Sequence, residues 1–500
     1  MSLVRRNLVA NFAGQGWTAL MGFVFVPFYL KFIGAEGYGL VGFFVLLSAA
    51  MALLDGGLAA TATRQIATFI NADGEGKART ITLLGTIEAL FWSVALTTGI
   101  TVAFAGRLIA VHWLKVDSQH IPQVVAGLRF MAAALVVQFP IAFYAGCLVG
   151  LQHQVLLNVI NSASATSRGV GAVLVLWLIA PNVQTFFAWQ CVLTLITVLV
   201  LRFSFWHYIG EARHARRFEL QALREVGKFA AGVGGINVFA FMLMQVDKIV
   251  LSKIMPLQSF GYYTLAWTLG TFASRFTAPI FNAYYPRITE LVVQSGYRDI
   301  LVPQDKTELE HLYLRASRVM AVVIVPFSVW LAFFSRELLA LWTRDPAIAK
   351  VAAGAVTLIA LGTMCNGFMN IPYGLQLASG WTGLAFWQNV IATLLLAPLT
   401  YVFATHYGLT GAALPWLILN LGYVLISAPL MHRVVLKSVK WSWYRSSVIF
   451  PVFQAICLIS LFHYLSTRIN GSLAVNAVLI AGLLTSVAVG TLSSGLVKAR

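Results

Sequence analysis

Residues 38–60 read YGLVGFFVLLSAAMALLDGGLAA, a stretch in which Asp55 is the only charged side chain. A helix needs about 20 apolar residues to cross the hydrocarbon core of a bilayer. The stretch therefore predicts a membrane-spanning helix, and comparable apolar stretches fill the chain almost from end to end.

Fourteen such stretches predict about 14 transmembrane helices. Their approximate ranges are 8–30, 38–60, 81–105, 121–149, 155–180, 183–206, 229–254, 260–285, 318–342, 350–377, 382–405, 409–432, 446–466 and 472–496. Several neighbouring spans are joined by very short turns, so a count of twelve is the main alternative.

The composition agrees with a membrane protein. Hydrophobic residues make up 59% of the 500 residues, charged residues only 10%, and the mean hydropathy is +0.81. Ordinary soluble domains carry about 25% charged residues. Only helices and closed barrels satisfy their backbone in a bilayer, and these stretches lack the short alternating pattern of barrel strands. We therefore expect an all-α polytopic membrane protein.

The positive charges indicate its orientation. If the N-terminus is inside, 22 of the 34 Lys and Arg residues belong to inner connections, 9 to outer connections and three lie within spans. The positive-inside rule then predicts cytoplasmic N- and C-termini. The basic residues are spread over several short loops, which argues against nucleic-acid binding and favours contact with anionic membrane lipids.

Motifs for enzymatic chemistry are absent from the sequence. There is no GxxxxGK[ST] phosphate loop and no HExxH metal motif, and no cysteine or histidine spacing indicates zinc. The longest connections, about 207–228 and 286–317, are too short for an external catalytic domain. The sequence therefore predicts no enzyme, no metal and no cofactor, apart from a coupling ion.

A weak internal sequence similarity divides the chain into two blocks. Gly37-Tyr38-Gly39 opens the second predicted span, and Gly261-Tyr262-Tyr263 opens the eighth. Six crossings return a chain to its starting side, so two six-helix blocks would have the same orientation, as in some transporters. Generic turn chemistry is the alternative explanation.

Several motifs, in order, resemble the polysaccharide flippases. They are Asn7-Leu8 through Pro27, Ile33 through Gly39, Leu54-Asp55-Gly56-Gly57-Leu58 with Arg64, Gly150 through Gln154, and Gln245 through Leu251 followed by Gly261-Tyr262-Tyr263. The family is that of the Wzx-type O-antigen flippases, within the multidrug/oligosaccharidyl-lipid/polysaccharide superfamily. The resemblance covers roughly residues 1–300.

The resemblance implies two six-helix lobes around a central cavity, followed by two C-terminal helices. The corresponding domains are an N-terminal lobe at 1–206, a basic cytoplasmic linker at 207–228, a C-terminal lobe at 229–435 and the additional helices at 436–500. It also implies that the chain moves an undecaprenyl-diphosphate-linked oligosaccharide from the cytoplasmic to the periplasmic leaflet of the bacterial inner membrane by alternating access. A polysaccharide polymerase and glycosyltransferases are the expected partners.

Two other functions remain open. The first is another member of the same fold, either a lipid II flippase or a cation-coupled multidrug exporter. The second is a membrane enzyme of glycan assembly. Such enzymes usually present a large outer loop, and no outer connection in this sequence is long enough to form one.

Three arginines within predicted spans are the candidate ligands of a diphosphate: Arg129, Arg168 and Arg275. Arginine donates bidentate hydrogen bonds to phosphate and stays charged. A charge inside a membrane costs at least about 2.5 kcal/mol, so it usually faces a cavity or a partner. The alternative is an arginine that locks two helices together by bonding carbonyls or an acid.

Polar side chains of the first span are candidates for sugar binding. Asn11, Gln15 and Thr18 share one helical face, with Asn7 a turn earlier. They would contact sugar hydroxyls or, alternatively, form hydrogen bonds between helices.

Acids are scarce within the spans. Asp55 and Glu88 have similar predicted depths, and two nearby carboxylates permit proton exchange. We expect them to act either in sodium or proton coupling or structurally, with Asp55 capping a helix or pairing with Arg64. Asp247 is the third candidate. Adjacent residues on a helix do not face one another, so Asp247 is not expected to pair simply with Lys248.

Overall fold

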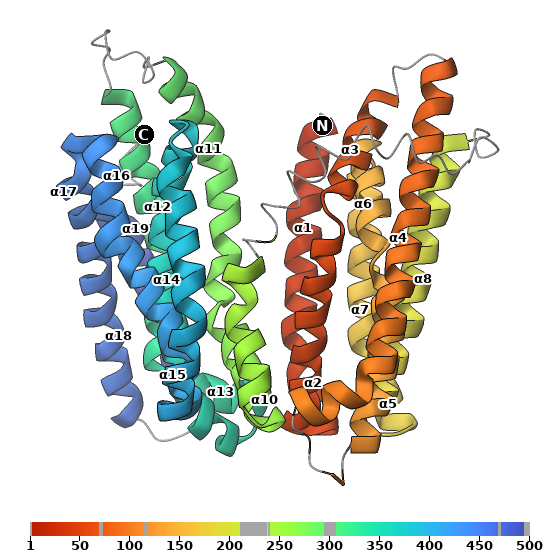
Figure 1. Cartoon of the computed structure of the whole chain (residues 1–500). Coiled ribbons are helices and arrows are strands. Elements are labelled where there is room, and N and C mark those ends of the chain that lie inside the picture. The colour runs from red at the N-terminus through yellow and green to blue at the C-terminus, as the bar shows by residue number, and fades with distance from the viewer. Residues whose placement is uncertain are drawn as a thin grey trace. The chain divides into compact units, whose positions relative to one another are not determined.

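A computed structural model describes residues 3–69, 74–114, 116, 118–119, 121–210, 238, 241–294, 307–468 and 472–494. These residues form helices joined by turns, with no strand among them (Figure 1). The chain divides into two compact units, Met1–Gly261 and Tyr262–Arg500. Each unit is described by itself.

The first unit holds the elements up to the start of α10. They are α1 (Leu3–Val24), α2 (Val26–Leu54), α3 (Leu58–Phe69), α4 (Gly74–Leu108), the π-helical η1 (Ile109–Trp113), α5 (Ile121–Gln138), α6 (Ile141–Gly150), α7 (Gln154–Leu178) and α8 (Val183–Ile209). Residues 241–254 are also helical; of the first part of the predicted span 229–254, residues 229–237 and 239–240 lie outside the described residues.

The second unit begins within α10 (Leu257–Gly270). Its elements are then η3 (Phe272–Phe276), α11 (Thr277–Gln294), α12 (Thr307–Phe333), α13 (Ser335–Thr343), α14 (Pro346–Ala378), α15 (Thr382–Gly422), η4 (Tyr423–Ser427), α16 (Ala428–Val434), η5 (Lys437–Val439), α17 (Lys440–Trp443), η6 (Tyr444–Ile449), α18 (Phe450–Arg468) and α19 (Ser472–Ser493).

Nine helical segments in the described part of the chain are long and apolar enough to cross a membrane. Large apolar side chains also cover their outer faces: Phe104 is 85% exposed, Trp177 70% and Leu394 70%. In water such faces would be costly, whereas lipid tails are as apolar as the side chains themselves. The prediction of an all-helical, multi-pass membrane protein is confirmed at this level.

Two glycines with non-helical backbone angles interrupt helices that are otherwise continuous, and each lies between two predicted spans. Gly34 has φ +69° within α2, and Gly408 has φ +59° within α15. Side-chain-bearing residues rarely adopt such angles, so glycine permits these reversals at little cost. Both glycines fall between spans that the sequence separates.

Several predicted spans are interrupted, which corrects their ranges. The span at 8–30 breaks at Phe25, between α1 and α2, and the span at 318–342 breaks at Phe334, between α12 and α13. The span at 38–60 ends at Leu54, where Gly56 and Gly57 both take positive φ before α3 begins. The span at 121–149 breaks at Phe139–Pro140 because proline cannot donate the helical hydrogen bond. The span at 260–285 breaks at the short 3₁₀ segment η3.

Close packing of α6 on α3 depends on two glycines spaced four residues apart. A β-carbon on Gly146 would lie 2.9 Å from the carbonyl oxygen of Ala59, and one on Gly150 would lie 2.7 Å from that of Thr63. The hydroxyl of Thr63 donates to the carbonyl of Gly146 at 2.9 Å. This small-xxx-small arrangement lets two helix backbones approach closely in a membrane.

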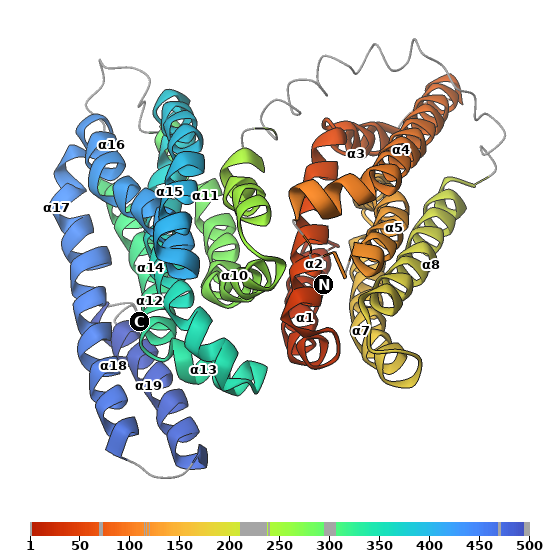
Figure 2. The same cartoon turned by 60° about the horizontal axis from the view of Figure 1, so that its bottom comes forward.

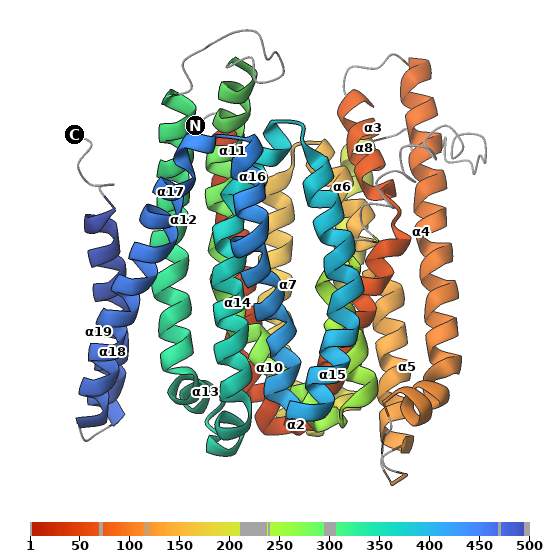
Figure 3. The same cartoon turned by 60° about the vertical axis from the view of Figure 1, so that its left-hand side comes forward.

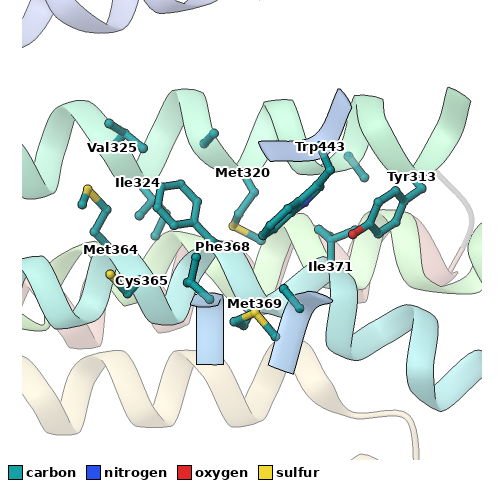
Figure 4. Packing of buried hydrophobic residues seen from close by; sticks show 14 of the residues in the cluster. Tyr313, Met320, Ile324, Val325, Met364, Cys365, Phe368, Met369, Ile371 and Trp443 are labelled. Carbon is teal, nitrogen blue, oxygen red and sulfur yellow. The ribbon is translucent and has the colours of Figure 1, made fainter. Parts of the chain in front are cut away.

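The core of the second unit lies where α12 and α14 meet the segment around Trp443. Figure 4 shows Met320, Phe368 and Trp443 among its buried side chains. The hydroxyl of Tyr313 lies 3.0 Å from Nε2 of His432, so this buried hydroxyl has a polar partner within the core. The core positions α12 firmly against its neighbours.

The two C-terminal helices, α18 and α19, pack against each other and against α12 (Figure 3). Ala455, Ile459 and Leu479 from this pair belong to the same buried cluster as the α12 side chains. The indole nitrogen of Trp330 donates to the carbonyl of Leu479 at 2.9 Å. The pair is therefore part of the second unit.

The predicted domain limits stay predictions. Of the expected linker 207–228, residues 211–228 lie outside the described residues. The limits of the predicted lobes, 206 and 435, fall within α8 and directly after α16.

Candidate functional site

Arg168 is the central residue of the candidate site in the first unit. It lies on α7, half-buried, and its Nη2 reaches the Thr194 hydroxyl of α8 at 3.5 Å. The buried Nε has no hydrogen-bond partner among the described residues. A buried donor without a partner costs about 1–3 kcal/mol, and more when charged. Arg168 therefore retains the capacity to donate to an anion.

The kink between α1 and α2 forms one side of this site. The ring of Phe25 packs so closely on α7 that a β-carbon on Gly169 would lie 2.1 Å from it. Tyr29, one turn further, packs edge-on against Phe186 of α8 with ring centroids 5.0 Å apart. Figure 2 shows α1, α7 and α8 in the same unit.

Amide and hydroxyl groups follow Arg168 along α7 and α8. The hydroxyls of Ser164 and Thr197 lie 2.7 Å apart. The Thr194 hydroxyl donates to the carbonyl of Gln190 at 2.6 Å. Gln190, Thr194 and Thr197 are all buried. Together with Arg168 they make a polar strip between two membrane-length helices.

The polar stripe of α1 divides into two parts. Asn11 donates to Oε1 of Gln154 at 2.7 Å and accepts from Nδ2 of Asn158 at 2.6 Å. Asn7 lies 3.4 Å from Oε1 of Gln152. These amides join α1 to the start of α7, which agrees with the alternative expectation that they form hydrogen bonds between helices. Gln15 is exposed on α1, one turn beyond Asn11.

Glu88 of α4 lies in a second, separate polar cluster. Its Oε1 accepts from Nε of Arg202 at 2.7 Å and from the Tyr144 hydroxyl at 2.6 Å. The indole of Trp92 donates to the same hydroxyl at 3.2 Å. The Glu88 side chain is 8% exposed and that of Arg202 43% exposed. An ion pair with hydrogen bonds therefore holds α4, α6 and α8 together.

The Glu88 cluster gives a testable stability prediction. Arg202→Leu removes one partner of a buried carboxylate, and we expect the free energy of unfolding to fall by about 1 kcal/mol, since solvent already screens the exposed arginine. The apparent Tm in detergent measures this loss. Adding Glu88→Gln should recover part of it, because a neutral amide needs no counter-charge. Equal losses in the single and double variants would contradict the ion-pair role.

The other two acids bond locally. Oδ1 of Asp55 accepts from the backbone N–H of Ala59 at 2.8 Å and caps the start of α3. Asp247 pairs with Lys248 at 3.2 Å, so the expectation of no simple pair was wrong. The lysine side chain is long enough to curl back, and its Nζ also donates to the carbonyl of Met244 at 3.0 Å.

The remaining two arginines are exposed in the structure. Arg129 lies on α5 in the first unit, and Arg275 lies on η3 in the second. The break that carries Arg275 begins where the Thr271 hydroxyl bonds the carbonyl of Trp267 at 2.6 Å. Discontinuous helices of this kind place backbone groups and charges near the middle of transporters.

Several residues of these clusters were missed from the sequence. Gln190, Thr194 and Thr197 lie on one helical face at spacings of four and three, a pattern that was visible. Arg202 lies within the predicted span 183–206, so as a scarce charge it was as visible in the sequence as Arg168. Tyr144 offered no signal, because the burial of its hydroxyl beside Glu88 depends on how α4 and α6 pack.

Two family descriptions match the sequence. Residues 4–292 match the family described as "Polysaccharide biosynthesis protein", and residues 304–402 match that described as MatE. A comparison with curated proteins gave no match.

Solved transporters share the fold. The lipid II flippase MurJ, in an inward closed conformation, superimposes with a TM-score of 0.67 at 15% identity, covering 97% of this chain and 99% of that chain. An inward-facing multidrug resistance transporter of the MATE family gives a TM-score of 0.65 at 13% identity, covering 84% and 96%. The MATE transporter DinF-BH, in complex with R6G, gives 0.59 at 15%, covering 86% and 95%. At such identities the likeness shows a common fold.

Proposed function

The chain belongs to the polysaccharide biosynthesis protein family, and from this premise we propose that it is a flippase for lipid-linked oligosaccharides. Its cargo would be an undecaprenyl-diphosphate-linked glycan, moved from the cytoplasmic to the periplasmic leaflet for polysaccharide or O-antigen synthesis. Its family and fold are those of membrane transporters, not of enzymes.

The observation that carries this proposal is the unpartnered Nε of Arg168. A diphosphate needs a cation to offset the cost of leaving water, and a guanidinium donates two parallel hydrogen bonds to phosphate oxygens. Arg168 uses little of its hydrogen-bonding capacity on the protein, because its bond to the Thr194 hydroxyl is long, at 3.5 Å. It is thus prepared to bind an anion.

The neighbouring polar strip suits a sugar. Gln190, Thr194, Ser164 and Thr197 offer amide and hydroxyl groups along the same two helices as Arg168. A glycan that leaves water keeps its hydroxyls satisfied only where such groups line its route. A cation beside hydroxyls and amides matches both parts of a glycan diphosphate.

The finer expectations belong to the same proposal. The chain would cross the membrane fourteen times and form two six-helix lobes around a central cavity that Arg129 and Arg275 also line. Both termini would be cytoplasmic, in the bacterial inner membrane. Transport would proceed by alternating access coupled to sodium or protons. A polymerase and glycosyltransferases would act beside the chain. Of the three candidate acids, Glu88 has hydrogen-bond partners on two other helices, Tyr144 of α6 and Arg202 of α8.

The test is leaflet-resolved translocation in proteoliposomes, with undecaprenyl-diphosphate-linked glycan and lipid II as parallel cargoes. We expect transport of the glycan-linked lipid by the native chain. Transport of lipid II alone would move the chain to the peptidoglycan-precursor flippases. Efflux of organic cations under a sodium or proton gradient, with no glycan-lipid transport, would overturn the proposal in favour of a drug exporter.

A further inference from the structure

The second unit contains a cavity of about 250 Å³ between α12, α18 and α19. Arg318 of α12 and Arg445 of η6 line it, together with Ser446, Gln454, Ser486 and Ser493. The other lining residues are apolar or glycine, apart from Ser494. Two cations and several hydroxyls thus surround one space beside the C-terminal helices (Figure 3).

The protein leaves part of this polar capacity unused. Arg318 donates through Nη1 to the carbonyl of Ser494 at 2.9 Å and through Nε to that of Leu314 at 3.3 Å. Neither its Nη2 nor the exposed side chain of Arg445 donates a hydrogen bond to another described residue. Ser486 is 2% exposed, and its hydroxyl has no partner there either.

The cavity has a polar end and an apolar end. Arg318, Arg445 and Ser493 lie toward the end of the unit where α19 finishes. Pro326 is eight residues further along α12, about 12 Å deeper at the rise of an α-helix, and Val322 lies between. A free anion would occupy only the polar end, whereas a lipid would occupy both ends. Ser486 would then lie at the level of the lipid's glycerol esters.

We propose that this cavity binds the phosphate of an anionic glycerolipid, which fastens α18 and α19 to α12. The two guanidinium groups would hold the phosphate, and the apolar lining would contact the start of the acyl chains. Arginine side chains recognise phosphate groups. Because the cavity has both polar and apolar lining residues, we expect the phosphate of a lipid and not free phosphate. The inference is independent of the transported cargo.

The test measures the Tm of the purified full-length chain in detergent, with phosphatidylglycerol, phosphatidylcholine or inorganic phosphate added. We expect stabilisation by phosphatidylglycerol at the lowest concentration, and little effect of the other two. Arg445→Gln should raise the required phosphatidylglycerol concentration about tenfold, since it removes one charged hydrogen bond. Without lipid, this variant should keep the native Tm, because Arg445 makes no hydrogen bond to the described part of the chain.

Arg433→Gln is the matched control. Arg433 is an exposed arginine on α16, shortly before Arg445 in the chain, and does not line the cavity. It should leave the phosphatidylglycerol response unchanged. Equal losses in both variants would overturn the site in favour of general surface charge. Equal stabilisation by inorganic phosphate would overturn the lipid as its occupant, and an undiminished response in Arg445→Gln would overturn the proposal.

Discussion

Arg168→Ala is expected to lower the initial rate of glycan-lipid translocation by about tenfold to a hundredfold while the chain stays folded. A hydrogen bond to a charged group contributes about 1.5–3 kcal/mol, and each 1.4 kcal/mol is a factor of ten. The fold loses little, because among the described residues Arg168 bonds one other side chain, the Thr194 hydroxyl, at 3.5 Å. The measurement is the rate in proteoliposomes, with monodispersity and Tm as tests of folding.

Two further variants sharpen this result. Arg168→Lys keeps the charge but loses the planar fork, so we expect an intermediate rate. Arg107→Ala removes an exposed arginine near the end of α4 and should transport like the native chain. A native rate for Arg168→Ala, in protein shown to be folded, would remove Arg168 from the transport route even if the native chain is a flippase.

Gly150→Val is expected to lower the free energy of unfolding by about 2 kcal/mol or more. Its β-carbon would lie 2.7 Å from the backbone oxygen of Thr63 and 2.8 Å from the side chain of Ile66. A backbone atom cannot turn aside as a flexible side chain can, so α6 and α3 must separate. Overpacking of this kind costs about 1–3 kcal/mol, and sometimes more. The apparent Tm in detergent and the yield of monodisperse protein measure it.

The control for this variant is Gly22→Val. Gly22 is an exposed glycine on α1, and nothing lies within 4 Å of the position of its β-carbon. Both changes add the same β-branched side chain to a helix, so their difference isolates the contact with α3. Similar losses in the two variants would show that helix propensity, and not the close approach of α6 to α3, decides the effect.

Sequence patterns predicted the membrane helices because length and apolarity are local properties. The breaks were harder to predict. Pro140 and the Asp55-Gly56-Gly57 turn carry local signals that the apolar stretches around them hid. The break at η3 has no proline or glycine within it, so nothing in its own residues predicted where the helix would stop.

The candidate site was predicted less completely, because its geometry depends on how helices face one another. Arg168 was identified as a scarce charge, but its contact with Thr194 required the packing of α7 on α8. The sequence predicted that Asn11 lies on a polar helical face. That its amide bonds Gln154 and Asn158 depends on the packing of α7 against α1, which the sequence does not show. A side-chain conformation decides the Asp247–Lys248 pair, and residue spacing does not encode it.

The attachment of α18 and α19 to α12 bears on how the chain is made. Trp330 bonds a carbonyl 149 residues later, and Arg318 bonds one 176 residues later. When α12 leaves the ribosome, these acceptors have not been synthesised. The face of α12 that will receive them must meet lipid, or the insertion machinery, until the last helix enters the bilayer. A nascent chain arrested before α18 should therefore carry α12 in a more accessible state than the finished protein.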